Sequence, residues 1–146
     1  MTSPSMLLNI GDGLTARNID AYSDEGALRK AAFHQDGKQF LKSLAKALAL
    51  RPGSFDIRSN LGGIAVSGEV TLHHERLYVQ LSESATGPGV SILYRACQGR
   101  KDYSGGRNHF CSIDGLQSAE GQTKFWTHCT RILSAPAAHV SAGVSA

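Results

Sequence analysis

Alternation of apolar and polar side chains in the middle of the chain predicts β-strands. From Ile64 to Leu72 every second residue is apolar or small, which is the period of a half-buried strand. Leu77 to Leu81 and Val90 to Cys97 repeat this alternation. The polar joint from His73 to Arg76 is too short for a crossover connection, so it predicts an antiparallel hairpin. We therefore expect a meander of three strands.

A helix is predicted on each side of this meander, because apolar residues recur there at helical spacing. The first helix begins at Ser23 or Asp24 and has a possible break at Gly37. It ends after Arg51, because a Pro-Gly pair follows. Ser118 can cap the second helix. The apolar faces comprise Phe40, Leu41, Leu44, Ala45 and Leu48 in the first helix, and Phe125, Trp126, Cys129, Ile132 and Leu133 in the second.

Together these patterns predict an α+β fold. We expect an antiparallel meander of three to four strands, covered on one face by the N-terminal and C-terminal helices. The fourth strand is the weaker alternation from Ser54 to Arg58. Residues 1–133 form one domain, with residues 1–23 as an N-terminal arm or edge strand, and residues 134–146 form a tail of small residues. The expected core contains Leu44, Leu48, Val70, Val79, Ile92 and Trp126.

Length and composition fit a single soluble domain. A chain of 146 residues with 41% apolar and 18% charged residues can bury one core without a covalent staple. The three cysteines are an odd number and no apolar leader opens the sequence, so we expect reduced thiols and a cytoplasmic location. No apolar run approaches the roughly 18 residues of a membrane span. The net charge of +3 permits an acidic partner such as nucleic acid.

The stretch from Gly99 to Phe110 is the most unusual part of the sequence. Its glycines allow backbone amides to approach an anion, its basic side chains supply charge, and its aromatic rings offer faces for unpaired bases. It matches no P-loop or dinucleotide-binding pattern, and a solvated connection would also explain the glycines, as turns. We take it as the candidate contact with nucleic acid or another polyanion. The residues concerned are Arg100, Lys101, Tyr103, Arg107 and His109.

Three lysines recur at four-residue intervals on the polar side of the first predicted helix. Lys38, Lys42 and Lys46 have no acidic residues at the same spacing. Such a stripe is usually a solvent-exposed face. We expect it to join the binding surface only if the helix lies beside the basic loop.

Catalysis is an alternative, because several residues are of the types found in metal-independent ribonucleases. There a His or Glu moves the proton of a 2′-hydroxyl group, and Arg or Lys stabilises the charge on the phosphate. A polar hairpin tip uses the same residue types simply because water surrounds it. The residues are His73, His74, Glu75 and Arg76 at the hairpin, with Lys101, Tyr103, Arg107 and His109 beyond it.

The cysteines do not form a recognisable metal motif. Cys97, Cys111, His128 and Cys129 could supply four ligands, but no C-x₂-C pair is present. Cys97 and Cys129 also fall at positions expected to face the core, where a thiol behaves as a small apolar group. We expect three reduced thiols, no metal and no cofactor.

The order of helix, three strands and helix resembles that of double-stranded-RNA-binding domains. Only Lys124 and Arg131 are basic in the final helix, however, so the residues assign no family. The sequence favours a non-enzymatic binding module that contacts nucleic acid or another polyanion. A protein-protein interaction, inhibitor or assembly protein, or a homo-oligomer, is the second alternative, and the metal-independent ribonuclease is the third.

Overall fold

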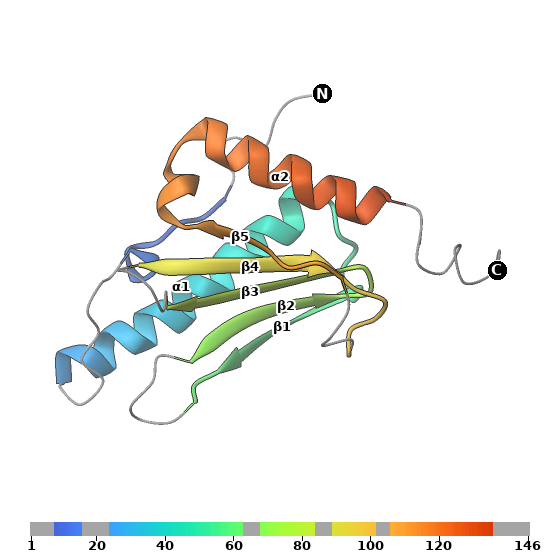
Figure 1. The fold of residues 1–146 in the computed structure, drawn as a ribbon. Helices are drawn as coiled ribbons and strands as arrows, with labels where there is room; N and C mark the ends of the chain where they lie inside the picture. The colour runs from blue at the N-terminus through green and yellow to red at the C-terminus, as the bar shows by residue number, and fades with distance from the viewer. Residues whose placement is uncertain (1–7, 16–23, 63–67, 84–88, 102–105, 136–146) are drawn as a thin grey trace.

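The computed structural model describes residues 8–15, 24–62, 68–83, 89–101 and 106–135 (Figure 1). Within these ranges, two long helices and five strands form the fold, with short 3₁₀ helices at Asp12–Leu14 and Asp114–Gln117. The elements are α1 (Asp24–Ala47), β1 (Phe55–Asn60), β2 (Glu69–His74), β3 (Leu77–Glu83), β4 (Val90–Ala96), β5 (His109–Ser112) and α2 (Ala119–Ser134).

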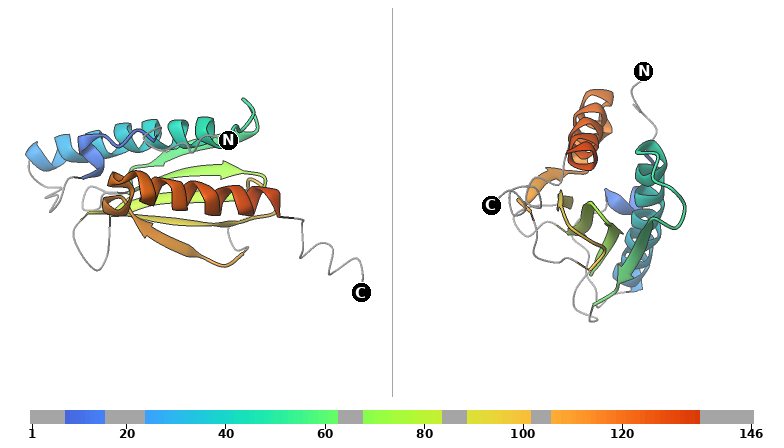
Figure 2. Two further views of the ribbon diagram at one scale, coloured as in Figure 1. Left: turned by 90° about the horizontal axis from the view of Figure 1, so that it is seen from above. Right: turned by 90° about the vertical axis from the view of Figure 1, so that its right-hand side faces the viewer.

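The sheet is an antiparallel meander, with its strands in the order β1-β2-β3-β4-β5. Both long helices lie on the same face of this sheet, as the end-on view in Figure 2 shows. α1 contacts β1 and β2, and α2 contacts β3 and β4. The predicted α+β class, with the helices on one face, is therefore confirmed. No helix of the described residues lies on the opposite face, and we call it the open face.

The core lies between the helices and the sheet. Leu44, Val70, Val79 and Ile92 are completely buried there, and Leu48 packs against them while partly exposed. Trp126 was expected in the core but is only half-buried. Its indole Nε1 donates a hydrogen bond to the Ala47 carbonyl oxygen at 2.9 Å. The indole therefore joins α2 to the end of α1.

Two predictions about α1 were wrong. The helix continues through Gly37, where a Cβ atom would lie 2.9 Å from Val70 Cγ2. Glycine here lets the helix approach β2 closely, and tertiary contact outweighs its low helix propensity. The helix also ends at Ala47 and not after Arg51. The Leu50 N–H reaches back to the Ala45 carbonyl at 2.9 Å, which is the bond that closes a Schellman motif.

The strands differ from the prediction at their ends. Part of the expected strand from Ile64 to Leu72, residues 63–67, lies outside the described residues, and β2 starts at Glu69. β2 also extends to His74, so the predicted four-residue joint is shorter. The strand β5 was not predicted at all. The capping role of Ser118 is confirmed, because its side chain accepts a hydrogen bond from the Gly121 N–H at 3.0 Å.

The described N-terminal segment, residues 8–15, is attached to α1. Leu8 and Leu14 are buried, and the Asp36 carboxylate accepts a hydrogen bond from the Gly13 N–H at 2.8 Å. The Asn9 N–H donates to the Ser43 hydroxyl at 2.8 Å. No helix in the described part of the chain is both long enough and apolar enough to cross a membrane.

Candidate nucleic-acid interface

A row of four polar side chains crosses one end of the open face. The strand register places Asp56 beside His73, His73 beside Tyr78, and Tyr78 beside Arg95. His73 is 5% exposed, Tyr78 9% and Arg95 4%. Such burial of polar groups requires that they bond to one another and that another segment covers them.

Side-chain contacts fix this row. The Arg95 guanidinium lies 4.7 Å from the centre of the Tyr78 ring, and the rings of His73 and Tyr78 meet edge to face with centroids 5.3 Å apart. His73 Nε2 is 2.8 Å from the Thr71 hydroxyl. Burial, followed by the charge of Arg58, lowers the pKa of His73, which keeps the imidazole neutral near pH 7. These contacts hold His73, Tyr78 and Arg95 together as a buried polar row.

The chain that follows β4 reaches the Asp56 end of this row, and we call residues 97–101 the strap. At its start the Cys97 N–H donates to the Arg76 carbonyl at 3.1 Å. Further along, Arg100 forms an ion pair with Asp56 at 3.4 Å and donates a hydrogen bond to the Gly53 carbonyl. The strap therefore reaches from β4 across to the first residues of β1.

The rest of the open face is not covered by the strap. Its central row runs from Arg58 through Thr71, Gln80 and Leu93 to Phe110. Phe110 lies on the edge strand β5 and is 66% exposed. Leu93, its partner on β4, is half-buried. An exposed aromatic ring beside an aliphatic side chain therefore forms a small apolar patch on a polar sheet face.

The basic residues predicted in the loop take different positions. Arg100 is engaged in holding the strap to β1. Lys101 and Arg107 are exposed on the two sides of the loop, and Tyr103 lies outside the described residues. Of this predicted set, Lys101 and Arg107 are the described side chains most accessible to an anion.

The three predicted lysines lie on the other side of the molecule. Lys38, Lys42 and Lys46 are exposed along α1, which packs on the helix-bearing face of the sheet. The strap crosses the open face, so the sheet separates most of α1 from it. The lysine stripe and the described strap therefore lie mainly on opposite sides of the sheet.

His109 points to the helix side of the sheet, because it precedes Phe110 on the same strand. Its ring is 4.3 Å, centroid to centroid, from that of His128 on α2. His128 Nδ1 is 2.8 Å from the Tyr94 hydroxyl, whose pKa burial raises to about 12. Burial and the neighbouring His128 lower the pKa of His109. This cluster attaches β5 to α2.

The histidines considered for catalysis are thus not assembled in one place. His73 bonds to Thr71 on the open face, His74 lines a pocket at the end of the sheet, and His109 contacts α2. The three cysteines are free thiols, and burial raises the pKa of Cys111 to about 12. In the ranges that the structure describes, no group of three or more His, Cys, Asp or Glu side chains is arranged to hold a metal ion.

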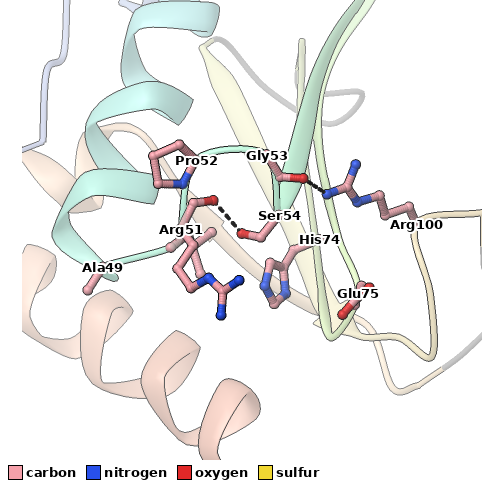
Figure 3. Close-up of a pocket in the computed structure, with 9 residues that line it drawn as sticks. Ala49, Arg51, Pro52, Gly53, Ser54, His74, Glu75 and Arg100 are labelled. Carbon is pink, nitrogen blue, oxygen red and sulfur yellow. Dashed lines mark hydrogen bonds between the residues drawn. The ribbon is translucent and has the colours of Figure 1, made fainter.

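The pocket that contains His74 was not predicted from the sequence. It has a volume of about 520 Å³ and lies where the α1–β1 connection, the β2–β3 hairpin and the strap meet (Figure 3). Arg51, His74, Glu75 and Arg100 are its ionisable lining residues. The sequence carries no signal for this pocket. Arg51 and Arg100 come from segments far apart in the chain, and only the fold brings them to one cavity.

Comparison of the chain with models of protein families, with curated proteins and with solved structures finds no match. The function must therefore be argued from the geometry and charge of the open face, the strap and the pocket.

Proposed function

We propose that this protein is a non-enzymatic module that binds single-stranded nucleic acid on the open face of its sheet. The observation that carries the proposal is the exposure of Phe110 beside Leu93 on a face that is otherwise polar. A large apolar side chain at 66% exposure contributes little to the folding of this chain. It is available to a ligand with a flat apolar surface.

Nucleobases are such a ligand. Stacking of a base on an aromatic side chain contributes about 1–3 kcal/mol and tolerates different bases, because every base has a π face. The Leu93 side chain, one strand away, extends the platform by roughly the 4.8 Å that separates neighbouring strands. Bases within a duplex cover each other's faces, so the platform favours single strands.

The charges around the platform suit the phosphate backbone. On the open face and along the described parts of the loop there are five basic residues and two acidic ones, a difference of +3. The two acidic residues are Asp56 and Glu69. Asp56 is paired with Arg100 and Arg58, so its charge is largely neutralised. The five basic residues are Arg58, Arg95, Arg100, Lys101 and Arg107.

A protein partner is the alternative. The polar character of the open face argues against it. The centre of a protein interface is usually depleted of charged residues, whereas the platform here is small, adjoins Gln80, and shares its row with Arg58 at the far end. We place the activity in the cytoplasm, where the three free thiols stay reduced. No catalytic role is needed for this proposal.

Fluorescence anisotropy with labelled single-stranded and double-stranded RNA and DNA tests it. We expect single strands to bind more tightly, and Phe110→Ala to weaken binding by about 5- to 150-fold. Leu28→Ala is the matched control, because Leu28 is 72% exposed on α1. The proposal fails if the folded protein binds no single strand at micromolar concentration and low salt, or if both variants lose affinity equally.

A further inference from the structure

The pocket at the end of the sheet contains two hydrogen-bond donors, Arg51 and His74, that the proposed interface does not use. Its walls come from residues 49–54 after α1, from the hairpin residues His74 and Glu75, and from Arg100 of the strap. In Figure 3 the Arg51 guanidinium lies beside the His74 ring, while Arg100 enters from the other side of the Gly53 backbone. Three segments distant in sequence thus bring two guanidinium groups and an imidazole to one cavity.

His74 can donate a hydrogen bond through its Nε2–H group. Its Nδ1 accepts a hydrogen bond from the Arg76 N–H at 3.0 Å, so the neutral ring carries its proton on Nε2. Burial is the largest cause of the lowered pKa of His74; Arg100 and Arg76 lower it further, and Glu75 opposes them. The surroundings therefore disfavour a positive charge on the ring, while a bound anion would favour one.

The pocket lining carries more positive than negative charge. Among the described residues Arg51 has no ion-pair partner, and Glu75 is the single acidic side chain in the lining. Arg100 bonds to Asp56 at 3.4 Å and to the Gly53 carbonyl, which leaves part of its five N–H donors for a ligand. Unpaired positive charge is therefore available at Arg51, with further N–H donors at Arg100.

A phosphate monoester fits these features. It carries a charge of about −1.5 to −2 near neutral pH and presents several acceptor oxygens, whereas a backbone phosphodiester carries only one negative charge. Guanidinium groups bind such oxygens in a bidentate manner. A volume of about 520 Å³ lies within the usual range of ligand pockets, so it can hold a phosphate together with the group that it esterifies.

We infer that this pocket binds a phosphate monoester, with Arg51, Arg100 and His74 as the donors. The phosphate can belong to a free nucleoside monophosphate or to the 5′ end of a nucleic acid, and the two sources present the same group. This site goes beyond the proposed interface, because it needs neither Phe110 nor the platform around it. Binding in the pocket and on the open face can therefore be tested separately.

The test is an NMR titration of the full chain with adenosine 5′-monophosphate, inorganic phosphate and adenosine. We expect both phosphates to shift the signals of residues 51–54 and 74–75 and to raise the pKa of His74. Adenosine should have neither effect. Arg51→Gln should weaken binding of the monophosphate by about 10- to 100-fold. Lys42→Gln, which removes an exposed charge on α1, should change it less than about twofold.

A pair of oligonucleotides with and without a 5′ phosphate distinguishes the sources. Tighter binding of the phosphorylated strand by the wild type, but not by Arg51→Gln, assigns the pocket to a nucleic-acid end. Equal binding of both strands, together with binding of the monophosphate, assigns it to a free nucleotide. The inference is overturned if phosphates and adenosine act alike, or if the two variants lose affinity equally. Phe110→Ala should leave unchanged the shifts that inorganic phosphate, which carries no base, causes at residues 51–54 and 74–75. Failure of one proposal is therefore distinguishable from failure of the other.

Discussion

Phe110 and Leu93 are cross-strand neighbours on the face of the sheet that carries no helix. The next residues along the same row, Gln80 and Thr71, are polar. Phe110 and Leu93 therefore pack against no apolar core on that face. The helix-bearing face shows the opposite situation, because Tyr94 on β4 packs edge to face against Phe125 of α2 with ring centroids 5.1 Å apart. One edge strand thus presents His109 to the protein interior and Phe110 to solvent.

The turn after α1 contains a residue whose replacement should stabilise the protein. Ala49 has a φ of 57°, the left-handed conformation at the position of a Schellman motif where glycine is favoured. Ala49→Gly should raise the free energy of unfolding by about 0.5–1 kcal/mol, because it removes a strain of roughly 1–2 kcal/mol at a smaller cost in backbone entropy. Urea unfolding measures this difference. Ala31→Gly, at an exposed position in α1, should lower stability by about 1 kcal/mol, and a similar loss for Ala49→Gly would refute the assignment.

Gly37 should be intolerant of even the smallest side chain. A Cβ atom there would meet Val70 Cγ2 at 2.9 Å, so we expect Gly37→Ala to destabilise the protein by about 1–2 kcal/mol despite the better helix propensity of alanine. Combination with Val70→Ala should recover part of the loss caused by Gly37→Ala. A double-mutant cycle by chemical denaturation gives this coupling energy. A stabilising effect of Gly37→Ala alone would show that α1 is not seated closely on β2.

Acidification should destabilise the fold through its histidines. The pKa values of His73, His74 and His109 are all lowered, chiefly by burial, relative to an ordinary value of 6.5. The unfolded chain therefore binds more protons than the folded one below about pH 7, and stability falls as the pH drops through 6.5 towards the folded values. Urea midpoints between pH 8 and pH 5 measure this, and His73→Gln should make the dependence shallower. A midpoint that stays constant or rises on acidification would contradict the buried, neutral state of these rings.

The dependence of nucleic-acid binding on salt should separate the two basic regions. Lys101→Ala and Arg107→Ala should each weaken binding regardless of base sequence and reduce the slope of log K against log salt by about 0.7–1 unit. Lys38→Ala and Lys42→Ala, on α1, serve as controls and should leave the slope unchanged. Anisotropy titrations at several salt concentrations give the four slopes. A reduced slope in the α1 variants alone would move the binding surface to the helix side.

The central strands and α2 could be predicted because their local patterns agree with their environment. Val70 and Val79 alternate with polar residues that face the open side, and Ser118 caps α2 as its sequence position indicates. The strand β5 could not be predicted in this way. Its aromatic residue, Phe110, faces solvent and its histidine faces the interior, which inverts the expected pattern of burial.

The candidate site was predictable only in part. The sequence indicated a basic, aromatic-flanked loop, but not that Arg100 pairs with Asp56, because the two are brought together by the strap crossing the sheet. The row that joins Asp56 to Arg95 likewise depends on the register of four strands. Gly37 appeared as a break because helix propensity is local, whereas the close approach to β2 is a tertiary contact.

The measurement that tests the central claim most directly is an NMR map of the residues that respond to a short single-stranded RNA. If the strand lies on the open face, the largest amide shifts should fall on Arg58, Gln80, Leu93 and Phe110, and on the exposed part of the basic loop. The amides around Lys38 and Lys42 should not move. Shifts confined to α1 or to the exposed side of α2, or none at a saturating concentration of RNA, would contradict the account.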